Sequence, residues 1–205
     1  MRRAATVAVA GLLGLVGPAG AQARPRLDVT LRERTDGPPD AIVTLRDLLA
    51  DDRFLSAMRS GFPLYMAYQV ELRESRSMWD RAVARDAWEL VVLYDPGRDV
   101  YQLEDERGTE EIRDRALLER RLAVAYVVEG LRPDGPGRFH YRGSVTARTL
   151  SDEDVDEVFA WLKGESGGAP HRPGLVTRTA RKLLIQVAPL PRITVEGRSA
   201  EFAGR

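Results

Sequence analysis

The run of residues with the most potential for chemistry is "LSDEDVDEVFAWLKG", Leu150–Gly164, which places five carboxylates within six positions. Closely spaced acids suggest a calcium loop, whose pattern also requires a glycine at the sixth position and a glutamate at the twelfth. Counted from the first aspartate, Asp154 and Asp156 fit that pattern. Glu157 stands where the glycine is required, and Lys163 stands where the glutamate is required. The metal interpretation therefore fails at two positions.

The same residues fit an α-helix throughout. Ser151 can cap the first turn, the carboxylates stabilise the positive end of the helix dipole, and Gly164 can end the helix. The apolar residues share one face: Val155, Val158, Phe159 and Leu162. The run therefore predicts a helix and leaves Trp161, one step off this apolar stripe, as a residue that could contact a partner.

Other reactive residue types are scarce. His140 and His171 are the only histidines, and neither has a spacing typical of a metal ligand. No serine-nucleophile motif, phosphate-binding loop or dinucleotide fingerprint occurs in the sequence. We therefore predict no catalytic residues, no metal and no cofactor. Two carboxylates brought together by the fold would still allow a hydrolase, because spacing in the sequence does not exclude such a pair.

The N-terminus has the layout of a secretory signal peptide. Arg2 and Arg3 precede an apolar run over residues 4–16, and small residues suitable for cleavage stand at Ala21 and Ala23. A membrane-spanning helix would need about 20 apolar residues. We therefore expect export to the periplasm or the cell exterior, with removal of the signal.

Composition limits the remaining possibilities. The chain has 31 basic and 31 acidic side chains among 205 residues, and it has no cysteine. Balanced charge gives no electrostatic footprint for nucleic acid. The absence of cysteine excludes disulfides, thiolate ligands and a lipoprotein anchor. Removal of residues 1–23 would leave residues 24–205, a length that suits a single domain with a sizeable core.

Alternating apolar residues predict several strands. The clearest runs over residues 64–73, with one face expected in the core and the other largely wet. Residues 27–31 predict a strand before a turn, and residues 41–49 resume the pattern. Residues 51–61 predict a short helix with an aspartate cap and a glycine stop.

Further along the chain, residues 87–104 predict a hairpin with Pro96 and Gly97 in its turn. Residues 109–120 predict a helix capped by a threonine. Residues 122–128 and 139–147 both alternate and predict another antiparallel pair. The fold class expected is mainly β (α+β), an antiparallel sheet or sandwich with covering helices.

Two of those covering helices are expected near the C-terminus, over about residues 151–187. On the second, over residues 173–187, an apolar stripe lies beside three basic residues, Arg178, Arg181 and Lys182. Such a helix can pack on the sheet with its basic side in water, or it can lie on an anionic membrane surface.

One segment, Ser60–Tyr101, contains several recognisable features in a fixed order. A small-residue-Gly turn precedes a long strand, then comes an Arg-x-x-Trp-Asp step, and then a Tyr-Asp…Tyr hairpin. These places are taken by Ser60 and Gly61, by Arg76, Trp79 and Asp80, and by Tyr94, Asp95 and Tyr101. The segment resembles an exported bacterial family catalogued as domain of unknown function 4390, with a likeness over about residues 27–149. The resemblance implies an envelope protein with a β-rich fold and no assigned catalytic residues.

The step "RSMWDRAVARD" within this segment supports two interpretations. Arg76 and Asp80 could pair across a bend while Trp79 packs over the sheet edge, which would make a structural corner. Alternatively, a ligand-facing patch could be formed by Arg76, Trp79, Asp80 and Arg81.

Three classes of function remain. The leading one is a non-catalytic envelope module that binds another protein through its sheet face or edge. The second is a membrane-surface protein that uses the basic helix, and the third is a hydrolase with an unrecognised carboxylate site. The sequence does not predict the oligomeric state.

Overall fold

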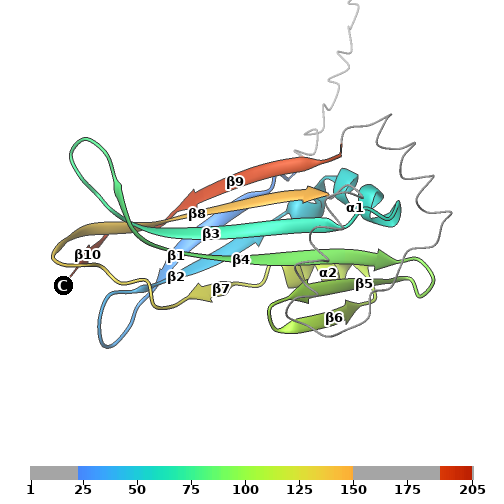
Figure 1. The fold of residues 1–205 in the computed structure, drawn as a ribbon, viewed down its shortest axis with the longest axis horizontal. Coiled ribbons are helices and arrows are strands. Elements are labelled where there is room, and N and C mark those ends of the chain that lie inside the picture. Colours follow the sequence, from blue (N-terminus) through green and yellow to red (C-terminus); the bar gives the residue numbers. More distant parts are fainter. Residues whose placement is uncertain (1–22, 150–189, 205) are drawn as a thin grey trace, which may run out of the picture.

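The computed structural model describes residues 23–149 and 190–204. Over these ranges the chain forms two antiparallel sheets that share one hydrophobic core, with two short α-helices from the middle of the chain (Figure 1). The expected mainly β, antiparallel architecture with helices is therefore confirmed. The helices predicted over residues 151–187 lie outside the described residues.

The smaller sheet has the order β1-β2-β7. Its strands are β1 (Arg26–Arg32), β2 (Asp40–Arg46) and β7 (Tyr126–Val128). The larger sheet has the order β10-β8-β3-β4-β5-β6, and β9 also pairs with β8. Its strands are β3 (Leu64–Glu74), β4 (Arg81–Asp95), β5 (Val100–Asp105), β6 (Gly108–Ile112), β8 (Gly137–Thr149), β9 (Arg192–Arg198) and β10 (Phe202–Gly204).

The centre of the larger sheet follows the predicted alternation. Strand β3 pairs along its whole length with β8 on one side and with β4 on the other. Its alternate side chains from Leu64 to Leu72 are fully or almost fully buried, and the residues between them are half-buried. The predicted hairpin over residues 87–104 is also confirmed, since β4 pairs with β5 around the turn. In that turn the Asp95 carboxylate accepts a hydrogen bond from the Gly97 amide at 2.9 Å.

The helices are short. A 3-10 turn, η1 (Leu48–Ala50), leads into α1 (Asp52–Arg59), and the aspartate that caps this helix is Asp51. The Asp51 carboxylate accepts from the Arg53 amide at 3.0 Å, and Gly61 follows the helix with a φ of 90°. The second helix is α2 (Arg115–Leu122), which packs against η1.

Two predictions for the middle of the chain are wrong. Helix α2 begins after an Asp114 cap, and not at Thr109, because residues 108–112 pair with β5 as strand β6. Residues 122–128 do not pair with residues 139–147: β7 is only three residues long and pairs with β2, whereas β8 pairs with β3.

A glycine pair brings the two sheets together at one side of the sandwich. Gly143 of β8 and Gly197 of β9 face each other in register. A Cβ atom on Gly197 would lie 2.3 Å from the Leu27 carbonyl oxygen of β1. Only glycine at this position lets the β1 backbone approach so closely without a shift.

The turn between β1 and β2 is fixed by a buried carboxylate. Asp40 is fully buried and accepts hydrogen bonds from Arg32 at 2.8 Å, from Arg34 at 3.1 Å and from Arg132 at 3.2 Å. Burial alone would raise the pKa of Asp40, but these three guanidinium groups hold it below its ordinary value. The cluster attaches the segment before β8 to the smaller sheet.

Candidate functional site

The β3–β4 corner, residues 75–80, contains most of the patch predicted from the sequence. Arg76 pairs with Glu74 at 2.7 Å, so the ion pair considered for Arg76 and Asp80 is not the one formed. Arg81 pairs with Glu74 at 3.1 Å and also with Asp134 at 2.9 Å. These contacts hold the base of the corner in place.

The tip of this corner is apolar and faces solvent. Met78 is 82% exposed and Trp79 is 70% exposed, so Trp79 does not pack over the sheet edge. Of the four predicted patch residues, Arg76 and Arg81 therefore meet at Glu74, Trp79 points away from the protein, and Asp80 turns towards the sheet.

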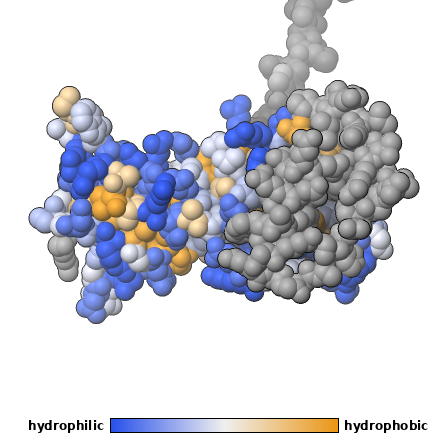
Figure 2. All heavy atoms as spheres, in the orientation of Figure 1, coloured by the Kyte–Doolittle hydropathy of each residue, from blue (hydrophilic) through white to orange (hydrophobic). Residues whose placement is uncertain are grey.

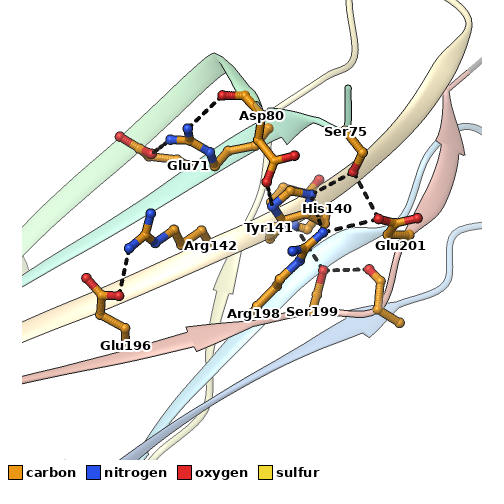
Figure 3. Close-up of polar contacts among 12 residues, drawn as sticks. Glu71, Ser75, Asp80, His140, Tyr141, Arg142, Glu196, Arg198, Ser199 and Glu201 are labelled. Atoms are coloured by element: carbon orange, nitrogen blue, oxygen red, sulfur yellow. Dashed lines mark hydrogen bonds and ion pairs between the residues drawn. The ribbon is translucent and has the colours of Figure 1, made fainter. Parts of the chain in front are cut away.

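Asp80 faces His140, which lies at the centre of a polar cluster (Figure 3). The Asp80 carboxylate lies 3.4 Å from His140 Nε2, while Ser75 Oγ lies 3.1 Å from Nδ1. The Arg198 guanidinium lies 3.4 Å from the same Nδ1 atom. Ser75 also donates to Glu201 at 3.1 Å. Residues from the β3–β4 corner, from β8 and from the β9–β10 segment thus meet at one imidazole.

The surroundings of His140 favour its neutral form. Burial, followed by the positive charge of Arg198, lowers the pKa of this histidine below its ordinary value of 6.5. A guanidinium can only donate, so Nδ1 is assigned as an acceptor and the proton as carried by Nε2, towards Asp80. His140 lies on the outer face of β8, as the alternation predicts, but the corner covers it and leaves only 1% of it exposed.

Ser75, His140 and Asp80 have the residue types of a hydrolytic triad. Here the single Ser75 hydroxyl proton is shared between the His140 ring and Glu201, and Arg198 competes at the same ring nitrogen. We therefore interpret this set as a clamp that ties the corner to the β9–β10 segment. Sequence reasoning missed it because its members are far apart in the chain and match no motif.

A second feature lies along β4. This strand has 15 residues, but β5 pairs only with Val91–Asp95. In the described part of the chain, Arg81–Leu90 pairs on one side only, with β3. Arg85, Asp86 and Ala87 are exposed there. The Ala87 amide donates to the carboxylate of its own neighbour Asp86 at 2.9 Å, so this amide is not engaged by a strand. Among the described strands, the first two thirds of β4 therefore form a free sheet edge.

A cleft of about 230 Å³ opens beside this edge. It is lined by residues 86–90 of β4, residues 105–107 at the β5–β6 turn and residues 126–128 of β7. Strand β7 has a free side too, since it pairs only with β2 among the described strands. Figure 2 shows hydrophobic side chains between polar ones on the face where β4 and β7 lie, and Val127 is 40% exposed. The cleft is thus a slot between two open strand edges, and we call it the edge cleft.

Aromatic rings back the edge cleft. Trp88 stacks on Tyr68 with ring centroids 5.0 Å apart, and Tyr126 lies 5.6 Å from Trp88. The Trp88 indole nitrogen and the Tyr68 hydroxyl are buried and have no hydrogen-bond partner among the described residues. The cleft therefore has an apolar wall. Behind this wall lie two hydrogen-bond donors that have no partner among the described residues.

Acidic side chains surround the opening. Asp86, Glu89 and Glu106 line the edge cleft, and none of them forms an ion pair with the described residues. Glu89 accepts a hydrogen bond from Tyr65, while Asp105 lies 3.6 Å from Arg121. No group of three or more acids or histidines in the described part of the chain is arranged to hold a metal ion.

The remaining predicted contact residues lie outside the described residues: Trp161, Arg178, Arg181 and Lys182. The membrane-surface helix thus remains a prediction from the sequence. Within residues 23–149 and 190–204, no helix has the length and apolar character needed to cross a bilayer.

Comparison with known proteins identifies no relative of this chain. No family model matches the chain, and neither does any curated protein or solved structure. The resemblance to domain of unknown function 4390 stays a prediction that depends on the pattern within residues 60–101. Function must therefore be argued from the geometry alone.

Proposed function

We propose that this protein is an exported, non-catalytic module that binds another envelope protein by strand addition to the free edge of β4. The observation that carries the proposal is the mismatch between β4 and its neighbours: β3 pairs with the whole strand, whereas β5 leaves Arg81–Leu90 open. An extended segment can complete such an edge with main-chain hydrogen bonds.

Several features support docking at this position. The open edge is flanked by the edge cleft, which can take side chains of an added strand on the inner face. Small side chains at Ala82, Ala84 and Ala87 add little bulk beside the β4 backbone. The expected signal peptide places the protein where envelope partners would be available.

The edge is also long enough to give specificity. Strands in globular proteins usually have about five or six residues, and the open part of β4 exceeds that length. A free edge this long carries a risk of aggregation unless a partner or a charge covers it. Arg81, Arg85 and Asp86 supply charges on this edge, which would disfavour indiscriminate pairing.

Site-specific photo-crosslinking in a bacterial host tests the proposal. A photoreactive residue replaces Arg85 on the open edge, and in a matched control it replaces Arg192, which is exposed on β9. We expect one envelope protein to be captured from position 85 and not from position 192. A second variant combines the photoreactive residue at position 85 with Ala87→Pro. Proline removes a main-chain amide from the open edge of β4, so this variant should no longer capture the partner.

Two results would contradict the proposal. One is equal capture from both positions, which would indicate random contact. The other is a capture at position 85 that survives Ala87→Pro in a variant whose circular dichroism matches the parent, because a strand could not then be using that amide.

A further inference from the structure

The charges around the edge cleft indicate what kind of strand would fit there, and this step rests on the proposed function. The protein as a whole has equal numbers of acidic and basic residues, and most described arginines on its surface are paired with carboxylates. At the edge cleft the balance differs. Asp86, Glu89 and Glu106 have no arginine partner among the described residues, and Arg107 is the only basic residue among the described residues of the lining.

Charge of one sign in a narrow slot matters more than the same charge on an open surface. A cleft wall of Trp88 and Tyr126 excludes part of the water that would otherwise screen the carboxylates. Aromatic faces also attract cations directly, with tryptophan the most effective. Acids and rings together therefore favour a lysine or arginine side chain.

The geometry of an added strand would deliver such side chains at regular intervals. Side chains on a strand alternate between two faces, so residues two apart enter on the same side of the β4 edge. Asp86 and Trp88 are separated by this spacing on β4, and Glu106 lies across the cleft at the β5–β6 turn. One basic side chain could thus contact acids from both walls.

We propose that the segment that adds to β4 is an extended basic strand, whose lysine or arginine side chains enter the edge cleft between Asp86 and Glu106 against Trp88. A second copy of this chain fits less well, because its own β4 edge carries acids (Asp86 and Glu89) as well as arginines and so matches an acidic cleft less well than a basic strand does.

Fluorescence anisotropy with two short peptides tests this inference on the signal-free chain, residues 24–205. In one peptide valine alternates with lysine, and in the other valine alternates with glutamate. We expect only the lysine peptide to bind, with an affinity that falls as salt is raised. In the double variant Asp86→Asn and Glu106→Gln the affinity should fall roughly tenfold, since two charge-assisted contacts are lost.

A matched control makes the same charge change elsewhere. Glu33→Gln with Asp36→Asn removes two exposed acids in the β1–β2 turn, outside the edge cleft, and should leave binding unchanged. The asparagine at position 86 keeps an oxygen for the Ala87 amide, so the β4 backbone is expected to stay in place. The test therefore does not depend on a variant that disturbs folding.

The outcomes separate the two proposals. Equal affinity for both peptides, lost on Ala87→Pro, would overturn the basic strand and leave strand addition standing. Lysine-peptide binding that survives the double variant would also overturn the inference, because the contact would then lie elsewhere. If neither peptide bound, the basic strand would be overturned, and photo-crosslinking from position 85 would decide on strand addition separately.

Discussion

At Gly197, the backbone of β9 lies so close to the backbone of β1 that one added methyl group would disturb the packing. The space at this position is closed by main-chain atoms of β1, and a backbone cannot rotate away as a flexible side chain can. His140 lies on the outer side of β8, the strand that pairs with β9, and it is buried there by polar residues of the β3–β4 corner and of β9. Individual residues thus fix the packing on both faces of the larger sheet.

Gly197→Ala tests the close approach. The new Cβ would meet the Leu27 carbonyl at 2.3 Å, so the sheets must separate locally. We expect the free energy of unfolding to fall by about 1–3 kcal/mol, as for other overpacked sites. Urea denaturation measures this change in the free energy of unfolding. The control is Gly97→Ala, where the Cβ meets only the Asp95 side chain at 3.3 Å in a surface turn. An equal, small effect of both substitutions would show that β1 does not pack as described.

His140 predicts a dependence of stability on pH. Its pKa in the folded state lies below the ordinary 6.5, so between these two values the unfolded chain binds more protons than the folded chain. Stability contributed by neutral His140 is therefore fully present above about pH 6.5 and falls as the pH drops through the lower, folded pKa, by at most about 1.4 kcal/mol per pH unit.

Denaturation in urea at a series of pH values above about 5, where ordinary carboxyl groups remain ionised, measures this slope. His140→Gln should flatten it, and His171→Gln should leave it unchanged, since these are the only two histidines. A slope that persists in His140→Gln would mean that another group causes the loss of stability.

At the scale of elements, sequence patterns predict strands well where one face is buried and the other is wet. Strand β3 satisfies that condition and was predicted correctly, whereas the β4–β5 hairpin was predicted correctly from the Pro96 and Gly97 turn between its strands. Strand β6 does not, because four of its five residues are exposed and it is held by pairing with β5, which leaves no periodic signal. The partner of β7 could not be predicted either, since its pairing with β2 joins residues as far apart in the sequence as Ala41 and Val128.

The last two strands were not assigned from the sequence. Residues 192–198 do alternate half-buried and exposed positions, so this pattern contained a usable signal for β9. Its place beside β8 depends on register contacts that begin at Arg148 and Arg192, and local patterns do not contain that information.

The open edge of β4 gives a prediction about proline at the element scale. Gln69 and Ala87 are opposite each other in register, but Gln69 lies on a strand paired on both sides. Gln69→Pro should remove a ladder hydrogen bond from the sheet interior and cost at least about 1–3 kcal/mol. Ala87→Pro should cost much less, because the Ala87 amide donates to the Asp86 carboxylate on a strand that is paired on one side only among the described strands. Thermal denaturation of both variants compares these losses of stability. Similar large losses would show that the Ala87 amide is needed inside the sheet.

At the scale of the whole molecule the sandwich is asymmetric. On one side β1 packs on β8 and β9 over two glycines, and on the other side the edges of β4 and β7 that have no strand partner among the described residues enclose the edge cleft. The sequence predicted a module that binds through a sheet face or edge, but it could not indicate which edge. The position of the edge follows from the short reach of β5 and from the placement of β7, and both depend on pairings distant in sequence.

The predicted corner and the edge cleft share one strand. Arg81 begins β4 at the β3–β4 corner, and Leu90 ends its open portion at the edge cleft. The exposed Met78 and Trp79 lie at the tip of the corner, just before this edge. A strand that docked along β4 would therefore run from the edge cleft towards this apolar tip.

Amide hydrogen exchange, resolved residue by residue by NMR with and without the alternating valine–lysine peptide, tests the central claim most directly. In the free protein, the Ala87 amide should exchange faster than amides of β3. With the peptide bound, amides on the open side of residues 81–90 should become protected, while those of β9 stay unchanged. Protection that appears elsewhere, or no new protection between Arg81 and Leu90 under saturating peptide, would contradict strand addition at β4.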